Sequence, residues 1–307
     1  MTASNFGTHN ATLIAPARGA LDDAALERAA AALPAAGKPG WLAQGRAADI
    51  SFSADSAIDH REMADRLRGM LPGVDVVVQP AANRRKKLLL ADMDSTMIAQ
   101  ECLDELADYA GLKPNIAAIT ERAMRGEIEF EPALRERVAM LKGVAAAAIG
   151  EIIENRITLT PGAKTLVATM KKHGAHTCLV TGGFTQFAER IGTMIGFNET
   201  RANRLKLDPD GHLSGLIEEP IFGRDAKHAA LIELRDKHGL QCVDTLAVGD
   251  GANDMDMIAE AGLGVAFHAK PRVAAAAPAR IDHGDLTALL YAQGYRENEF
   301  VPGNRSA

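Results

Sequence analysis

One short segment constrains the fold of this chain more than any other, an apolar run followed by two closely spaced carboxylates. Residues 88–91 read Leu-Leu-Leu-Ala, and Asp92 and Asp94 come directly after them. Such a run is typical of a short buried strand and is too brief for a helix. Side chains at positions i and i+2 of an extended segment share one side. The segment therefore predicts a strand that presents two carboxylates beyond its C-terminal end, where open α/β sheets bind ligands.

The two carboxylates need a partner. Like charges so close together repel each other, so we expect a cation or a shared proton between Asp92 and Asp94. Magnesium suits this position because it takes oxygen ligands and accompanies phosphate substrates. An Asp-x-Asp pair alone is equally compatible with a solvated turn, so the rest of the chain has to decide.

Length and composition are those of an ordinary globular protein. The 307 residues are 47% apolar and 24% charged, which leaves room for two or three domains. The net charge of −6 predicts no broad attraction to nucleic acid or to an anionic membrane. No apolar run reaches the length of a membrane span, and the N-terminus lacks a signal-peptide pattern. The three cysteines are widely spaced and fit neither a disulfide framework nor a zinc site, so we expect a cytoplasmic protein.

Residues 1–80 predict a small separate α/β module. Strand and helix patterns follow one another in the order β-α-β-β-α-β, which describes a split βαβ unit. The order of elements resembles an ACT-type domain. That resemblance implies serine sensing or a homodimer through the module, and the alternative is a packing domain that binds no ligand. Residues 84–87, in the linker that follows, are all positively charged. A solvated link before a buried strand explains them better than a nucleic-acid site does.

After Asp94 the sequence predicts four short helices, at 101–110, 115–125, 131–141 and 145–155. A helical block inserted directly after such a strand predicts a cap that closes over the site and excludes water. The α/β alternation then resumes and includes a hairpin around the turn at 208–211. We therefore predict an α/β core at 81–97 and 157–296, a helical cap at 98–156 and a tail at 297–307.

Three of the predicted core strands end in polar loops. The loops read Asp92-x-Asp94, Thr181-Gly182-Gly183 and Gly249-Asp250-Gly251-x-Asn253-Asp254, and Lys227 lies at a helix start between the last two. This ordered set resembles the haloacid dehalogenase superfamily of phosphotransferases. The resemblance covers roughly residues 86–290 and implies a Rossmann-like core with an inserted four-helix cap. Glu101, Phe130 and the run Leu134-Arg135-x-Arg137-Val138 resemble, within that superfamily, the phosphatases that act on phosphoserine.

The resemblance implies a role for each carboxylate. Asp92 would be the nucleophile that forms an aspartyl-phosphate, and a carboxylate is already ionised at neutral pH. Asp94 would protonate the departing seryl oxygen and later take a proton from the hydrolytic water. One Mg²⁺ per active site would be held by Asp92, the backbone carbonyl of Asp94, and Asp250. Asp254 would be an outer ligand, and its alternative reading is an acid at a helix N-terminus.

The phosphate group would be bound by a hydroxyl, by amides and by an ammonium group. Thr181 offers the hydroxyl, and Gly182 and Gly183 offer backbone amides. Lys227, together with magnesium, would offset the negative charge of the phosphate as it approaches Asp92.

The remaining contacts would select the substrate. Arg137 can bind a carboxylate in bidentate fashion, Glu101 can pair with an ammonium group, and Phe130 would shield the pocket from water. Asn253 would donate to the phosphate or the substrate, or would cap a helix.

The predicted function is hydrolysis of O-phospho-L-serine to L-serine and phosphate, which the resemblance places at the last step of serine synthesis. The first alternative is a phosphatase or phosphotransferase that acts on another small phosphomonoester. The second is an amino-acid-binding regulatory protein that works through residues 1–80.

Overall fold

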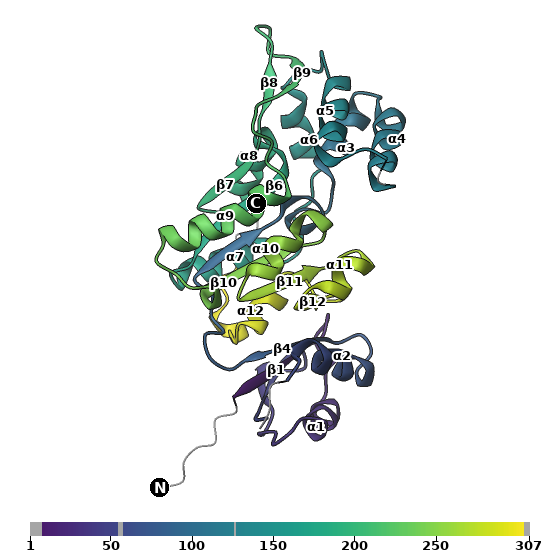
Figure 1. The fold of residues 1–307 in the computed structure, drawn as a ribbon. Coiled ribbons are helices and arrows are strands. Elements are labelled where there is room, and N and C mark those ends of the chain that lie inside the picture. Colours follow the sequence, from purple (N-terminus) through teal and green to yellow (C-terminus); the bar gives the residue numbers. More distant parts are fainter. Residues whose placement is uncertain (1–7, 55–57, 126, 304–307) are drawn as a thin grey trace.

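The centre of the molecule is a six-stranded parallel sheet in this computed structural model, which describes residues 8–54, 58–125 and 127–303 (Figure 1). The strand order is β12-β11-β10-β5-β6-β7. Strand β5 (Leu88–Ala91) has the predicted bounds and lies between β10 (Thr245–Gly249) and β6 (His176–Phe184). The other strands are β11 (Leu263–Phe267), β12 (Ala279–Ile281) and β7 (Glu199–Asn203).

Helices cover both faces of this sheet. Leu88 and Leu90 of β5 pack into the hydrophobic cluster that contains Leu231, whereas Leu89 packs into the cluster that contains Leu166. Burial on both faces explains why the β5 sequence is continuously apolar. The core helices are α7 (Ala163–Lys172), α8 (Thr185–Ile195), α9 (Arg224–Lys237), α10 (Met255–Glu260), α11 (Pro271–Ala276) and α12 (Ala288–Ala292).

Four helices form the predicted cap beside the C-terminal edge of the sheet (Figure 1). They are α3 (Cys102–Tyr109), α4 (Lys113–Met124), α5 (Phe130–Met140) and α6 (Ala148–Asn155). The hairpin of β8 (Leu205–Leu207) and β9 (Leu213–Ile217) extends from the core and packs against the cap. Leu213 N donates to Val144 O at 2.8 Å. The sequence placed this hairpin in the core segment and did not predict its contact with the cap.

The N-terminal module has the predicted order of elements. They are β1 (His9–Ile14), α1 (Asp23–Ala31), β2 (Gly40–Ala43), β3 (Ala47–Phe52), α2 (His60–Met70) and β4 (Asp75–Pro80). The strands form an antiparallel sheet in the order β2-β3-β1-β4. Ile14, Ala47 and Val77 of this sheet belong to the same hydrophobic cluster as Leu289 of α12. The module is therefore packed onto the core rather than tethered beside it (Figure 1).

A buried carboxylate joins the module to the core. Asp75, at the start of β4, is completely buried and accepts hydrogen bonds from the backbone amides of Asp282, His283 and Gly284. The two shortest of these bonds measure 2.7 Å. One buried carboxylate thus satisfies three backbone amides of a core loop, among them the buried amide of Gly284.

Replacing Asp75 by Ala is expected to lower the free energy of unfolding by about 3 kcal/mol, because buried amides lose a charged acceptor. Urea unfolding, followed by circular dichroism, measures this change. Asp23→Ala on the exposed side of α1 is the matched control and is expected to cost less than about 0.5 kcal/mol. Equal effects of the two substitutions would contradict the anchoring role of Asp75.

The basic linker at residues 84–87 is also bonded to the rest of the chain. Arg84 pairs with Asp49 at 2.6 Å, and its guanidinium also donates to Ala292 O at 3.1 Å. Arg85 pairs with Glu299, Lys87 pairs with Asp244, and Lys86 donates to two backbone carbonyls. The four cations therefore have partners inside the chain.

Three further observations complete the fold. Strand β6 was expected to end at residue 180 but continues through Phe184, so the loop predicted at 181–183 lies in its last part.

Residues 297–303, predicted as a tail, lie against α7, where Val301 N donates to Thr169 Oγ1 at 2.8 Å. Residues 304–307 fall outside the described part of the chain. No helix among the described residues is long and apolar enough to cross a membrane.

Candidate active site

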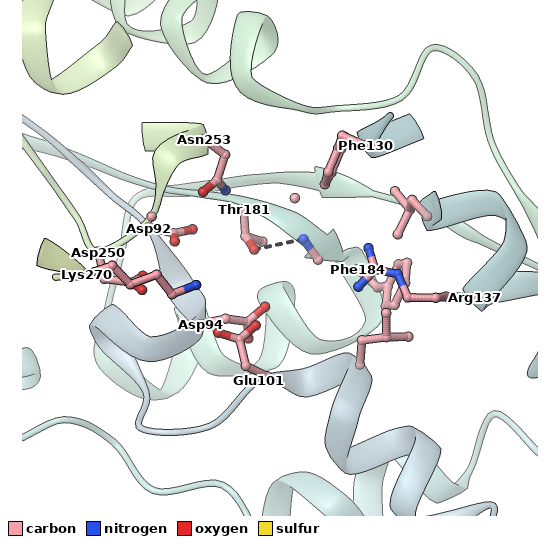
Figure 2. Close-up of a pocket in the computed structure, with 15 residues that line it drawn as sticks. Asp92, Asp94, Glu101, Phe130, Arg137, Thr181, Phe184, Asp250, Asn253 and Lys270 are labelled. Atoms are coloured by element: carbon pink, nitrogen blue, oxygen red, sulfur yellow. Dashed lines mark hydrogen bonds between the residues drawn. The ribbon is translucent and has the colours of Figure 1, made fainter. Parts of the chain in front are cut away.

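The predicted site residues meet at the C-terminal ends of three neighbouring strands (Figure 2). Asp92 follows β5, Asp250 follows β10, and Thr181 lies near the end of β6. Because Val248 and Leu179 both pair with Ala91, these ends lie at one edge of the sheet. They border a cavity of about 180 Å³. The predicted residues that line it are Asp92, Asp94, Glu101, Phe130, Arg137, Thr181, Gly182, Gly183, Asp250 and Asn253.

Lys227 and Asp254 lie behind the cavity wall. Lys227 is completely buried, and its Nζ contacts Asp92 Oδ1 at 2.5 Å and Asp254 Oδ1 at 2.7 Å. Burial alone would lower the pKa of Lys227, but the two carboxylates raise it above its ordinary value. Asp254 Oδ2 accepts from Gly251 N at 3.0 Å, so this carboxylate also closes the turn at 251–254. Lys227 thus remains charged and holds Asp92 in place from behind.

Asp94 lies on a tight turn at Met93–Met97, in which Ser95 has a φ of +53°. Its Oδ1 accepts from the backbone amide of Cys102 at 3.2 Å, and the Ser95 hydroxyl donates to Glu101 Oε1 at 2.7 Å. Burial, followed by the negative charge of Glu101, raises the pKa of Asp94 to about 7. The turn therefore supplies a carboxyl group that can hold a proton near neutral pH.

The carboxylates of Asp92, Asp250 and Asp254 form an acidic cluster in which one oxygen of each lies within 4.8 Å of the others. Burial and the charges of Asp254 and Glu101 raise the pKa of Asp250 to about 6. Burial and Asp254 likewise raise the pKa of Asp92, and Lys227 opposes that rise. A donor set made only of oxygen atoms and short of positive charge fits Mg²⁺. Asp250 is freer than Asp254 to bind a metal ion. Among the described residues only the Thr96 hydroxyl donates to its carboxylate, at 3.3 Å, whereas both oxygens of Asp254 accept hydrogen bonds.

The loop at 181–183 is positioned by a residue that the sequence did not reveal. Asn203, buried at the end of β7, donates to Gly182 O at 2.8 Å and to Phe222 O at 3.0 Å. Gly183 N donates to Thr181 Oγ1 at 2.9 Å, so the hydroxyl proton of Thr181 remains available to a phosphate oxygen. The Gly183 amide is therefore used inside the loop in this structure. A lone Asn after a strand carries no motif, and only the position of β7 at the sheet edge could have pointed to it.

The cap contributes Arg137 and Phe130. Arg137 is half-buried on α5, its Nε donates to Ala133 O at 3.3 Å, and burial lowers its pKa. Phe130 lies across the gap between cap and core, since a Cβ at Gly182 would lie 3.5 Å from its Cζ and a Cβ at Gly223 would lie 3.3 Å from its Cε1. Glycine at 223 therefore gives the aromatic ring room to close that side of the cavity, whereas a Cβ at 182 would make an ordinary contact with it.

Asn253 and Lys270 are two further residues of the cavity wall. The Asn253 side chain caps no helix; it lines the cavity opposite Asp94 in Figure 2. Lys270 also lines the cavity, and the sequence analysis missed it. It follows β11, a fourth strand whose C-terminal end reaches the same edge of the sheet. Ligands bind beyond the C-terminal ends of the strands in open α/β sheets, and the same expectation applied to β11 would have pointed to Lys270.

Comparison with known proteins places this geometry in a family. The family described as haloacid dehalogenase-like hydrolase matches residues 89–259. A phosphoserine phosphatase of Polaromonas sp. is 47% identical over 209 residues, which are 66% of this chain and 88% of that protein. A crystal structure of a probable phosphoserine phosphatase from Vibrio cholerae matches 97% of this chain and 90% of its own, with a TM-score of 0.74 and 28% identity. A structure of a phospho-aspartyl intermediate analogue of phosphoserine phosphatase matches 67% of this chain and 98% of its own, with a TM-score of 0.62 and 38% identity.

Proposed function

We propose that this chain, which belongs to the haloacid dehalogenase-like hydrolases, hydrolyses O-phospho-L-serine to L-serine and phosphate. In a cell it would then catalyse the last step of serine synthesis. The observation that carries the proposal is that charged groups suited to the two ends of the substrate lie on opposite sides of one small cavity. Asp92, Asp250 and Lys270 lie at one end of the view in Figure 2, and Arg137 lies at the other, with Glu101 also on the wall. A phosphate ester that also carries a carboxylate and an ammonium group matches this arrangement.

Asp92 is the proposed nucleophile. Its Oδ1 is held by Lys227, and no described residue donates to Oδ2, which leaves that oxygen to attack the phosphorus. The attack forms an aspartyl-phosphate and breaks the bond between phosphorus and the seryl oxygen. Lys227 opposes the rise in the pKa of Asp92 and fixes the direction of its carboxylate, so little reorganisation accompanies the attack.

Asp94 is the proposed acid and base. With a pKa near 7, it can carry the proton that the departing seryl oxygen needs. Once the serine alcohol has left, the same carboxylate can accept a proton from the water that hydrolyses the aspartyl-phosphate. The amide of Cys102 holds Asp94 Oδ1, so Oδ2 carries the mobile proton.

Asp92, Asp250 and the backbone carbonyl of Asp94 would hold one Mg²⁺, which when bound would offset the charge of the phosphate group. The support for this proposal is the all-oxygen donor set and the raised pKa values of Asp92 and Asp250. Asp254, whose two oxygens already accept from Lys227 and Gly251, would act as an outer group that orients the others.

Two further proposals concern the chain as a whole. A homodimer through the N-terminal module is supported by β2, an edge strand of its sheet that is open to pairing with another strand. A cytoplasmic location is supported by the three cysteines, which are all free.

Replacing Arg137 by Ala tests the substrate assignment. The proposed function predicts that kcat/KM for O-phospho-L-serine falls by about 100-fold, because the substrate carboxylate loses a half-buried charged partner. Turnover of an aryl phosphate, which has no such carboxylate, should change less than about threefold. Phosphate release with Mg²⁺ measures both. Arg125→Ala is the matched control, because Arg125 lies at the end of α4, is exposed and pairs only with Glu121 and Glu127 among the described residues.

Equal losses of activity on the two substrates would point to a general role of Arg137 in the cap. A wild-type chain that hydrolyses other small phosphomonoesters in preference to phosphoserine would overturn the substrate assignment and leave the family chemistry in place.

A further inference from the structure

The Lys270 side chain is a cation without a partner. Its backbone is fixed, because Lys270 O accepts from the amides of Val273 and Ala274 at the start of α11. Its side chain is exposed, and no hydrogen bond or ion pair joins it to any other described residue. A cation that lines a cavity and has no carboxylate partner there is available to a ligand.

The charges on the cavity wall explain why such a cation is needed there. The wall carries four carboxylates, those of Asp92, Asp94, Glu101 and Asp250, against two cations, Arg137 and Lys270. The charge of Lys227 is already balanced, because it is buried behind Asp92 and bonded to two carboxylates. A phosphate dianion that enters this cavity therefore meets a wall with more negative than positive groups. Among the described residues on that wall, Lys270 supplies an ammonium group that has no carboxylate partner.

The position of Lys270 in the cavity determines which end of the substrate its ammonium group can contact. In Figure 2 its ammonium group points into the cavity and lies beside Asp92, Asp94 and Asp250, on the other side of the cavity from Arg137. Burial and the charges of Asp254 and Glu101 raise the pKa of Asp250, and the positive charge of Lys270 opposes that rise, as expected for near neighbours. Lys270 thus belongs to the end where the proposed nucleophile lies.

Lys270 also lies at the entrance of the catalytic cavity. A larger hollow of about 580 Å³ between α4 and the core shares Phe130, Arg137, Gly251, Asn253 and Lys270 with the catalytic cavity. Lys270 therefore stands where a ligand passes from the outer hollow to the inner cavity. A positive charge on the wall of a cleft concentrates anions and raises the rate at which they bind.

We propose that Lys270 is a further substrate-binding residue, whose ammonium group attracts the phosphate dianion at the cavity mouth and contacts it at the end next to Asp92. The inference rests on the proposed function only in that the substrate is a phosphomonoester. It assigns Lys270 to the phosphate, whereas Arg137 would serve the carboxylate, and this difference makes the two roles separable.

The test is steady-state kinetics of Lys270→Met and Lys270→Arg beside the wild type. Lys270→Met is expected to lower kcat/KM by about 10-fold on O-phospho-L-serine and on an aryl phosphate alike, mainly through KM. The inhibition constant of inorganic phosphate should rise by a similar factor. Lys270→Arg keeps the charge and should stay within about threefold of the wild type. The difference between the wild type and Lys270→Met should shrink as salt is raised to about 0.5 M, because exposed charges are screened.

Lys172→Met is the matched control. Lys172 is an exposed lysine at the end of α7, which precedes β6 and so lies at the opposite edge of the sheet, and its loss should change nothing. The proposal is overturned if Lys270→Met equals the wild type, if the loss appears on phosphoserine alone, or if Lys270→Arg loses as much as Lys270→Met. The aryl phosphate and inorganic phosphate still report on Lys270 if the wild type fails to turn over phosphoserine, so failure of the substrate assignment is recognised separately.

Discussion

Replacing Asp92 by Asn is expected to lower kcat/KM for O-phospho-L-serine by about 10⁴-fold or more and to leave the chain folded. An amide is a far weaker nucleophile than a carboxylate, and the loss of a covalent nucleophile has an effect of this order in other enzymes. The fold should persist because the Asn oxygen can still accept from Lys227 Nζ, and Asp254 still neutralises that cation at 2.7 Å. The effect should be the same on any phosphomonoester, because the lost step does not involve the rest of the substrate.

Two measurements separate this role from a general effect of charge. An acid quench with substrate carrying radiolabelled phosphate should trap label on the wild-type chain and none on Asp92→Asn. The matched control is Asp210→Asn at the exposed turn of the β8–β9 hairpin, which should retain wild-type turnover and label. Activity of Asp92→Asn within tenfold of the wild type, or label that persists on it, would move the nucleophile to another residue.

The part of the site that could be predicted from sequence is the part that rests on strand ends. A four-residue apolar run followed by Asp92 and Asp94 is typical of a short strand buried on both faces, and parallel strands bring their C-terminal ends to one edge. The polar loops after three predicted strands, and the family that they resemble, implied that Asp92, Thr181 and Asp250 would share one site, and the structure places all three on one cavity. The cap was predictable for a similar reason, since four helix patterns follow one another without a strand between them.

The remaining features depend on contacts between residues far apart in the sequence. Asp75 looks like an acid at the start of a strand, and its amide partners lie 207 to 209 residues further along the chain. Asn203 supports Gly182 only because β7 pairs with β6, and the hairpin meets the cap through Leu213 and Val144. No periodicity or turn signal encodes such pairings, which follow from how the finished elements pack.

Lys227 shows how far sequence reasoning reached at the site itself. The family resemblance implied that Lys227 would act beside Asp92, and the structure places its Nζ 2.5 Å from Asp92 Oδ1. The sequence could not reveal that α9 is packed against β5 and β10 closely enough to bury the ammonium group completely. That burial changes the expected consequence of losing Lys227 from a loss of activity alone to a loss of stability as well.

Replacing Lys227 by Met is therefore expected to lower the free energy of unfolding by about 3–5 kcal/mol, as well as the activity. Removing one partner of a buried ion pair leaves the other charges without compensation in a medium of low dielectric constant. Here two carboxylates, those of Asp92 and Asp254, would face each other across the position of the lost ammonium group. Urea unfolding without added magnesium measures the change, so that no bound cation masks it.

The double substitution Lys227→Met with Asp254→Asn separates charge from packing. If uncompensated charge causes the loss, removing one carboxylate should restore about half of the lost stability, because the remaining Asp92 no longer meets a like charge. Lys237→Met is the matched control, since Lys237 lies on the same helix but is 58% exposed and only 4.0 Å from Glu199, and it should cost less than about 0.5 kcal/mol. A double variant no more stable than Lys227→Met would assign the loss to packing of the lysine side chain instead.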